Sequence, residues 1–510
     1  MTSRAQGKLD NIDAFEPTFV EALEPALPHI AKYGIKVACN AGATDTRRLW
    51  EVVCGMVERN GLALKVAWVG GDEVLPAVKA AIEKGERFEN LCTGQALGDW
   101  GFEPIYAQAY LGGLGIAAAF EKGADIVVCG RVSDASPVIG AAVWWHGWGR
   151  GELEKLANAF VAGHLIECSN YVCGGNYSGF KGLEGKGWED IGYPIAEISA
   201  QGEVVITKNR DSGGEVSVGT CTSQLLYEIQ GPWYFNSDVT AELDELWFEQ
   251  LSTDRVALKG VKAEPPPPTT KIGITAKGGY MAEVHWFIVG LDVKEKARMM
   301  EAQVRKTLQP YSHRFTRLEF TLNGSCPENP TNQNTATVDL RIVAQAPEAE
   351  DLAPGKFLRP CIDPIMEGYP GSTCQLDFRQ GFPRPVYEYY VTLLPQADVH
   401  HTVNMHDERS FEIPPPAETR TYPRQQPSRL ATRDAVDLSK FGQTVRGPLG
   451  WLVHARSGDK GSDCNVGLWV RYKDEWDWLR TLLNVEKLKE LLAEEYKGKP
   501  IVSPSSSYPV

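Results

Sequence analysis

A regular alternation of short apolar runs and longer amphipathic runs, between residues 30 and 150, constrains this chain more than any other feature. The apolar runs lie in IKVACNAG (35–42), LKVAWVGGD (64–72) and the end of LGGLGIAAAFEKGADIVVCG (111–130). Amphipathic segments follow them, one over about 44–60 and one in PAVKAAIEKGE. Strands that are apolar on both faces and alternate with helices are typical of a parallel sheet covered by helices. The sequence therefore predicts an α/β fold in this region.

Proline-rich stretches divide the rest of the chain. The first α/β unit spans 30–263, includes Gly-rich loops, and ends at the stiff segment EPPPPTT. Strand and helix patterns over 270–407 predict a second α/β unit of βαββαβ order. Residues 408–445 are rich in Pro, Arg, Ser and Thr, which predicts a linker. Two apolar strands around a polar loop, followed by helices, predict a small α+β domain over 446–510.

Charge and composition exclude several classes of protein. The chain has 52 basic and 66 acidic residues, so its net charge is −14. That charge argues against sequence-independent binding to nucleic acid or to an anionic membrane. Apolar runs long enough to span a bilayer, or to form a signal peptide, are missing from the sequence. The 11 cysteines are scattered and form no CxxC pair, which favours a reduced, cytoplasmic protein.

The turn after the first predicted strand is the first candidate site. Ligands of doubly wound sheets bind outside the carboxyl ends of the strands. Asn40, Thr44 and Asp45 lie at such an end, and Gly42 permits close approach of a ligand to the backbone. A simple capped strand–helix turn is the alternative interpretation.

The segment CGRVSDASPVIGAA, at the end of a deeper strand, is the second candidate. Arg131 is suited to hold a carboxylate or phosphate, Ser133 to contact it, and Asp134 to act as a general base. In the alternative interpretation, Ser136 caps a helix and Arg131 pairs with Asp134.

The third candidate is the stretch ECSNYVCGGNY over 167–177. Asn170 and Asn176 are candidate substrate contacts, and Glu167 is a further possibility. Cys173 is a weak candidate nucleophile because no histidine follows it at a recognisable spacing. A polar loop whose groups satisfy one another is the alternative.

The fourth candidate is HARSGDKGSD over 454–463, which the sequence predicts to be a long polar loop between two strands. Arg456 and Ser457 would bind an anionic ligand, and Asp459 and Lys460 would act in catalysis. An internally paired loop is the alternative.

A group of histidines lies at 400, 401 and 406 beside Asp407. Its spacing matches no metal-site pattern, so we interpret it as a surface loop and expect no metal.

Several of these segments together resemble the acyclic terpene utilisation (AtuA-type) protein family. The resemblance rests on LGGLGIAAAFEKGADIVVCGRVSDASPVIGAA, HLIECSNYVCGGNYSGF, VGTCTSQLLYEI and HARSGDKGSDCNVGLWV. It implies a Rossmann-like amino-terminal region and a small ferredoxin-like carboxy-terminal domain joined by a variable linker. It also implies a part in the catabolism of branched, terpenoid-type acids carried as coenzyme A esters.

Together these features predict an enzyme that acts by acid/base chemistry, of the lyase or hydratase type, on a carboxylate or acyl-CoA substrate. We expect it to use no redox cofactor, to bind a small anionic substrate and to form a homo-oligomer. Two alternatives stay open. The chain is a non-catalytic metabolite-binding or scaffold subunit of an acyl-CoA pathway, or it is a hydrolase with Cys173 or a serine as nucleophile.

Overall fold

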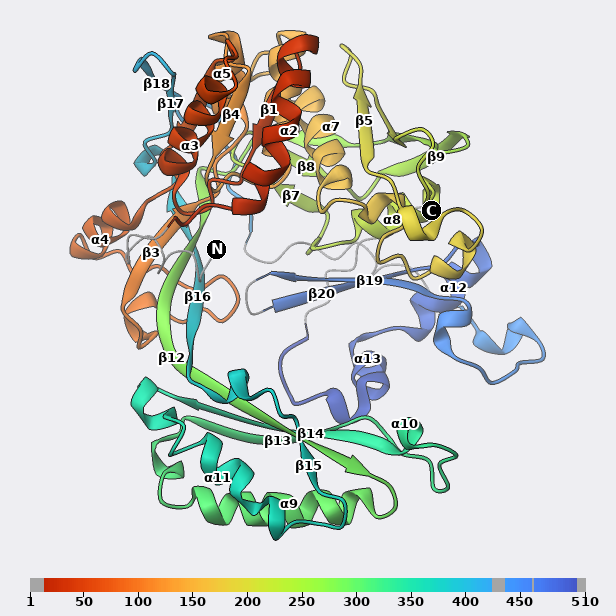
Figure 1. Cartoon of the computed structure of the whole chain (residues 1–510). Coiled ribbons are helices and arrows are strands. Elements are labelled where there is room, and N and C mark those ends of the chain that lie inside the picture. The colour runs from red at the N-terminus through yellow and green to blue at the C-terminus, as the bar shows by residue number, and fades with distance from the viewer. Residues whose placement is uncertain (1–12, 424–435, 461–462, 502–510) are drawn as a thin grey trace.

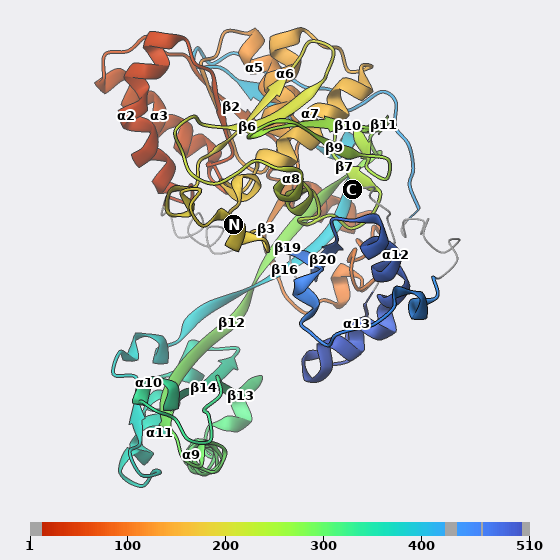
Figure 2. The same ribbon diagram turned by 90° about the vertical axis from the view of Figure 1, so that its right-hand side faces the viewer.

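The computed structural model describes residues 13–423, 436–460 and 463–501. The chain is a mixed α/β protein with a large body and a smaller lobe at the end of two long strands (Figure 1). A C-terminal unit lies beneath the body, beside those strands (Figure 2). In the described part of the chain no helix is both long and apolar enough to cross a membrane.

The predicted parallel strands are confirmed in the first sheet of the body. Its strand order is β1-β4-β2-β17-β18, with β1, β4 and β2 parallel and the last two strands antiparallel. Its strands are β1 (Val37–Cys39), β4 (Ile126–Cys129), β2 (Val66–Gly70), β17 (Thr402–Asn404) and β18 (Ser410–Glu412). The surrounding helices are α2 (Pro17–Tyr33), α3 (Thr46–Arg59), α4 (Leu75–Glu83) and α5 (Leu114–Glu121).

Both faces of the parallel part of this sheet are covered, because successive side chains of β1, β4 and β2 enter different cores. In β4, Ile126 and Val128 pack in the core that contains α2 and α3, whereas Val127 and Cys129 pack in the core that contains α5. This arrangement explains why the strands are apolar at every position.

The other half of the body contains α6 (Ser136–His146), α7 (Leu153–Ile166) and α8 (Val218–Leu225). They pack with two antiparallel sheets whose strand orders are β5-β6-β10-β9 and β11-β8-β7. The first sheet has β5 (Pro194–Ile198), β6 (Val204–Lys208), β10 (Arg255–Lys259) and β9 (Trp247–Ser252). The second has β11 (Lys262–Glu264), β8 (Thr240–Glu242) and β7 (Trp233–Phe235).

Strand β12 (Thr269–Val289) belongs to both the body and the lobe. Ile272 and Ile274 in its first half pack in the body, whereas Trp286 and Ile288 near its end pack in the lobe. It pairs with β3 (Pro104–Ala109) and β16 (Arg384–Pro395) on the body side and with β14 (Thr337–Ala346) in the lobe. The lobe is completed by α9 (Val293–Leu308), β13 (Arg317–Asn323), α10 (Gln333–Ala336), α11 (Leu358–Ile362) and β15 (Thr373–Cys374).

The C-terminal unit begins with a regular hairpin, so the predicted long polar loop is wrong. Strand β19 (His454–Lys460) pairs with β20 (Asp463–Trp469), and Lys460 stands opposite Asp463. Arg456 and Gly458 are buried while Ser457 and Asp459 are exposed, which is the alternation of a strand with one face on the body. Two helices, α12 (Lys473–Leu482) and α13 (Val485–Leu492), follow the hairpin.

Part of the predicted linker packs on the body. Strand β18 joins the first sheet, and the Arg420 N–H donates to the carbonyl of Pro266. The Tyr422 hydroxyl donates to the carbonyl of Pro265. Residues 424–435 of the predicted linker lie outside the described residues.

Candidate active site

A cavity of about 360 Å³ opens where the parallel sheet meets the second half of the body. Asn40 follows β1, Asp134 follows β4, and Glu167 begins the third predicted segment, so three predicted candidates meet here. The other lining residues are Cys168 and Glu228. Three carboxyl groups, a thiol and an amide therefore line the cavity.

The turn after β4 supplies Asp134. Nη2 of Arg131 lies 2.7 Å from Oδ1 of Asp134, and 27% of the Asp134 side chain is exposed against 11% for Arg131. The Arg131 backbone N–H donates to the buried carboxylate of Asp72 (2.8 Å). The Ser133 N–H donates to the carbonyl of Leu111. The turn therefore combines the ion pair of the alternative interpretation with a carboxylate that faces the cavity.

Behind Arg131 lies a cluster of aromatic and cationic groups. The Arg131 guanidinium and the Lys271 ammonium each lie 4.1 Å from the centre of the Tyr110 ring. The Tyr110 and Tyr389 hydroxyls are 3.2 Å apart. Burial and Tyr110 raise the pKa of Tyr389, so this phenol stays protonated. Strands β12 and β16 supply Lys271 and Tyr389 from far along the chain.

Helix α7 ends at the opposite wall and supplies Glu167 and Cys168. Cys168 and Ser169 have φ of 57° and 63°, so the chain turns sharply there in the left-handed region. Burial raises the pKa of the Cys168 thiol, and Glu167, Glu228 and Asp134 raise it further. This thiol therefore lies among carboxylates rather than beside a base that would activate it.

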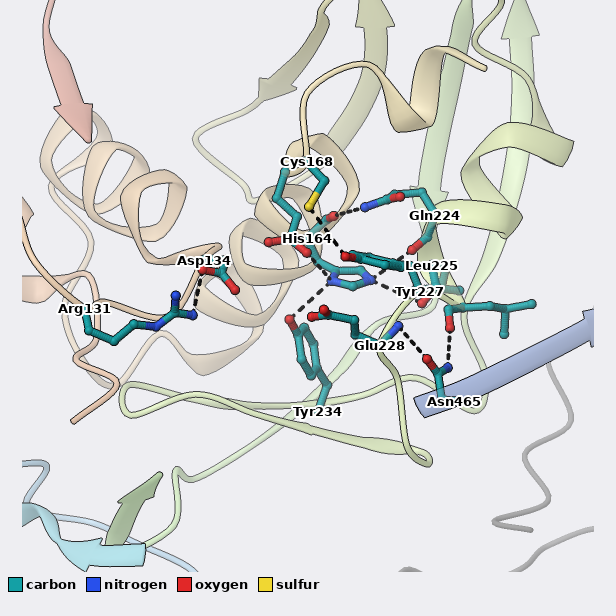
Figure 3. A network of polar contacts seen from close by, with 12 residues as sticks. Arg131, Asp134, His164, Cys168, Gln224, Leu225, Tyr227, Glu228, Tyr234 and Asn465 are labelled. Carbon is teal, nitrogen blue, oxygen red and sulfur yellow. Dashed lines mark hydrogen bonds and ion pairs between the residues drawn. The ribbon is translucent and has the colours of Figure 1, made fainter. Parts of the chain in front are cut away.

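A histidine and a tyrosine lie beside the cavity and were missed by the sequence interpretation (Figure 3). Nε2 of His164 donates to the carbonyls of Gln224 (3.0 Å) and Leu225 (3.2 Å), because carbonyls only accept. Nδ1 of the ring lies 3.2 Å from the Tyr234 hydroxyl and 3.8 Å from Oε1 of Glu167. Burial raises the pKa of Tyr234 well above its ordinary value, and nearby carboxylates raise it further. Those carboxylates are Glu167, Asp134 and Glu228.

Glu228, on the segment after α8, completes the wall. Its φ is 60°, a left-handed conformation that is unusual for glutamate. Its backbone N–H donates to Oδ1 of Asn465 on β20, at 3.0 Å. The C-terminal hairpin therefore contacts a residue that lines the same cavity as Asp134.

The turn after β1 contributes less than predicted. Thr44 is 2% exposed, and its hydroxyl donates to the carbonyl of Ala14 (3.1 Å). Asp45 is the N-cap residue of α3 and does not line the cavity. Only Asn40 of the three predicted residues reaches the cavity.

The two predicted asparagines of the third candidate lie outside the cavity lining. Nδ2 of Asn170 donates to the carbonyls of Ile191 and Gly192, so this amide joins two loops. Asn176 is exposed, and its carbonyl accepts from Nη1 of Arg456.

The predicted residues of the fourth candidate also lie outside the cavity lining. Arg456 is 4% exposed and is held between the rings of Tyr171 (4.1 Å) and Tyr227 (4.5 Å). Ser457 and Asp459 are exposed on the outer face of β19. Lys460 ends that strand, and its side chain lies outside the described part of the structure.

Cys173 and His401 have environments that their sequence positions do not suggest. Cys173 is buried, and burial raises the pKa of its thiol to about 12, which removes the thiolate that a nucleophile needs. The expectation that the histidines form a surface loop is wrong for His401. Its ring packs on Gly115 of α5, where a Cβ would lie 2.4 Å from Nε2. Across the described residues, no three His, Cys, Asp or Glu side chains are grouped to hold a metal ion.

The missed cavity residues lie in segments already singled out by resemblance. His164 and Cys168 lie in HLIECSNYVCGGNYSGF on either side of the predicted candidate Glu167, and Glu228 is near the end of VGTCTSQLLYEI. In each segment a charged residue follows an apolar helical run, which is a signal for a functional helix end. Tyr234 and Asp72 carry no comparable signal.

The comparisons with known proteins agree with the resemblance. A family model described as acyclic terpene utilisation family protein AtuA matches residues 1–405. No curated protein and no solved structure matches the chain. The matched region contains α6, α7, α8 and all five residues that line the cavity, and it covers most of the chain. The chain therefore belongs to the acyclic terpene utilisation family.

Proposed function

We propose that the chain is an enzyme that performs acid/base chemistry, of the lyase or hydratase type, on a branched, terpenoid-type acyl thioester. The observation that carries this proposal is the grouping of Asp134, Glu167 and Glu228 around one cavity, with the Tyr234 phenol among them. Carboxyl groups and a protonated phenol supply the base and the acid that such reactions need. Membership of the family supports a terpenoid acyl group.

The charge of the cavity favours a thioester over a free acid. A free carboxylate entering beside three carboxyl groups would be repelled. A thioester carbonyl is neutral and becomes negative only in the transition state. The acyl end therefore enters the cavity while the anionic carrier stays outside.

In the proposed reaction Asp134 accepts the proton from the carbon next to the thioester carbonyl. Arg131, paired with Asp134, keeps that carboxylate oriented. Tyr234 donates a proton to the β-hydroxyl, the C–O bond breaks, and water and a C=C double bond are formed. The proton that Asp134 accepted then returns to the Tyr234 phenolate, so that both groups recover their starting states. Hydration is the same sequence in reverse.

A thiol-dependent hydrolase is less well supported. Cys173 is buried, and the carboxylates around Cys168 disfavour its thiolate. A non-catalytic binding subunit remains the second candidate, because the same cavity would bind an acyl group without chemistry.

The test incubates the full chain in D₂O with methyl-branched 3-hydroxyacyl-CoA and 2-enoyl-CoA thioesters and follows deuterium at the α-carbon by mass spectrometry. We expect incorporation by the wild type and its loss in Asp134→Asn. Absence of exchange by the wild type, with thioester binding retained, would establish the binding subunit instead. Equal exchange by Asp134→Asn would remove Asp134 from the reaction.

A further inference from the structure

The C-terminal hairpin is bound to the segment that carries Glu228 by one side chain. Oδ1 of Asn465 accepts from the N–H of Glu228 at 3.0 Å. Nδ2 of the same amide donates to the carbonyls of Leu226 (2.8 Å) and Ile229 (3.0 Å) (Figure 3). A single asparagine therefore holds three backbone groups within the segment 226–229.

Two glycines allow the hairpin to approach this segment closely. A Cβ at Gly458 would lie 2.7 Å from the backbone nitrogen of Glu228. A Cβ at Gly467 would lie 2.6 Å from the Cβ of Leu226. These positions therefore need glycine for space, because any side chain would push the hairpin away from 226–229.

Aromatic contacts fix the hairpin at its open end. The His454 ring stacks on Trp469 (4.3 Å between centroids) and faces Tyr177 (5.8 Å). The Arg456 guanidinium lies between Tyr171 and Tyr227, whose faces offset part of the cost of burying its charge. The hairpin is thus anchored on the residues that adjoin the cavity wall.

Glu228 has a backbone conformation that the segment 226–229 would not keep without the contacts of the hairpin. Its φ of 60° is disfavoured for a residue with a side chain and persists only where the surroundings impose it. The hydrogen bonds from Asn465 act directly on this residue and its neighbours. The side chain of Glu228 then lines the cavity with Asp134.

We infer that the C-terminal hairpin is a positioning element of the candidate active site, in which Asn465, Gly458 and Gly467 set the backbone of Glu228 and place its carboxylate in the cavity. The role of Glu228 in turnover rests on the proposed function, whereas the docking itself does not. Asn465 is a positioning residue that lies beyond the matched residues 1–405. The segment HARSGDKGSDCNVGLWV therefore contains the two paired strands, β19 and β20, that contact residues 226–229.

The first test measures amide hydrogen exchange of residues 226–229 by mass spectrometry in the full chain. Asn465→Ala removes the three hydrogen bonds, and Gly458→Ala pushes the hairpin away from the segment 226–229. We expect the Glu228 amide to exchange about tenfold faster in both variants. Gly450→Ala is the matched control, because a Cβ there meets no atom within 4 Å. Wild-type exchange at 226–229 in both variants would overturn the inference, and so would equally faster exchange in the parallel sheet.

The second test uses Cys168 as a reporter inside the cavity. Burial and neighbouring carboxylates, Glu228 included, raise the pKa of its thiol, and Tyr227 lies 3.8 Å from its sulfur. Moving 226–229 takes the Glu228 carboxylate away from this exposed thiol and lowers the pKa of the thiol, so iodoacetamide should label it several-fold faster in Asn465→Ala, relative to Cys92 in the same chain. An unchanged labelling ratio would contradict the inference.

Glu228→Gln separates the inference from the proposed function. It removes the charge and leaves the backbone bonds to Asn465. We expect wild-type amide exchange at 226–229 with loss of α-deuteration. Full α-deuteration by Glu228→Gln, together with faster exchange in Asn465→Ala, would refute the role of Glu228 while the docking stands.

Discussion

The turns after β1 and β4 begin from neighbouring parallel strands and end differently. Both carry polar side chains at the carboxyl edge of one sheet, where Val37 stands opposite Ile126. Thr44 in the first turn is buried and bound to Ala14, whereas Asp134 in the second faces the cavity. A position at the carboxyl edge is therefore not sufficient to make a ligand site.

What packs over each turn makes the difference. The segment before α2 covers the turn after β1, where Glu16 donates its N–H to the carbonyl of Ala41. The turn after β3 is more filled, because the Asp238 carboxylate accepts from Gly113 at the N-terminus of α5 (2.6 Å), and Leu111, Gly112 and Asp238 line a cavity of only about 30 Å³. Over the turn after β4 the covering segments leave the cavity of about 360 Å³, which Asn40 from the turn after β1 also lines.

Removing the carboxylate from each of the two turns, in separate variants, should give the largest effect. Asp134→Asn removes the proposed base, and we expect α-deuteration to fall by about 10²–10⁴-fold. Asp45→Asn, in the turn after β1, should stay within about twofold of wild type because Asp45 does not line the cavity. Thermal unfolding of both variants checks that they fold. Comparable losses in the two variants would erase the distinction between the turns.

Asp72 joins the two turns, so its removal should damage both. Its Oδ2 accepts from the Arg131 N–H and from Nε2 of Gln108, which also donates to the carbonyl of Ala43. Asp72→Ala leaves two buried donors without this acceptor, and we expect a loss of about 3–4 kcal/mol in unfolding free energy, measured by urea denaturation.

The charge of Asp72 provides a separate test, in the variant Asp72→Asn. Burial raises the pKa of Asp72 above its ordinary value. The folded state then holds its proton to higher pH than the unfolded state, so stability falls as pH rises from about 4 through the folded pKa. Asp72→Asn should remove this component; a pH profile identical to the wild type would contradict it.

Acid should destabilise the fold through His401, whose ring packs on Gly115 of α5. Burial lowers the pKa of His401 to about 4, and the charge of Arg150 adds to this. Between about pH 6.5 and 4 the unfolded chain binds a proton that the folded chain refuses, so the unfolding free energy should fall by about 3 kcal/mol. The loss of unfolding free energy is complete once the pH is below the pKa of His401 in the folded state.

Replacing His401 by Gln should flatten this acid limb in urea denaturation. His406→Gln is the control because His406 is exposed a few residues away. Retention of the full limb in His401→Gln would assign it to other groups.

The smallest effect is expected at Thr44. Thr44→Val keeps the shape of the side chain and leaves the carbonyl of Ala14 without the hydroxyl donor. We expect a loss of about 1–2 kcal/mol in unfolding free energy with α-deuteration unchanged. A loss of α-deuteration at wild-type stability would instead place the turn after β1 in the active site.

The parts of the fold that sequence predicted well are those set by local patterns. Val66–Gly70 and Ile126–Cys129 are apolar throughout, and only a strand buried on both faces explains such short runs. The hairpin was mistaken for a loop because Arg456 and Asp459 are charged, and charge masked the period-two alternation of a strand.

The candidate site was predicted where a residue follows a predicted strand and, for Glu167, where a residue follows a predicted helix. Asn40 and Asp134 are in the first class. Glu228 and Tyr234 come from a segment about a hundred residues later, and Asn465 comes from the C-terminal unit. Such residues meet through packing between elements, which no local pattern encodes.

The sequence by itself determined that this chain has a parallel sheet, that polar turns end its strands, and that its family is the acyclic terpene utilisation family. These properties follow from side-chain periodicity and motif identity, which are local. The tertiary structure decided which turn stays open, that its walls are acidic, and that a distant hairpin holds Glu228. Those outcomes depend on which surfaces cover one another, because burial closes one turn with a hydrogen bond and leaves space at the next.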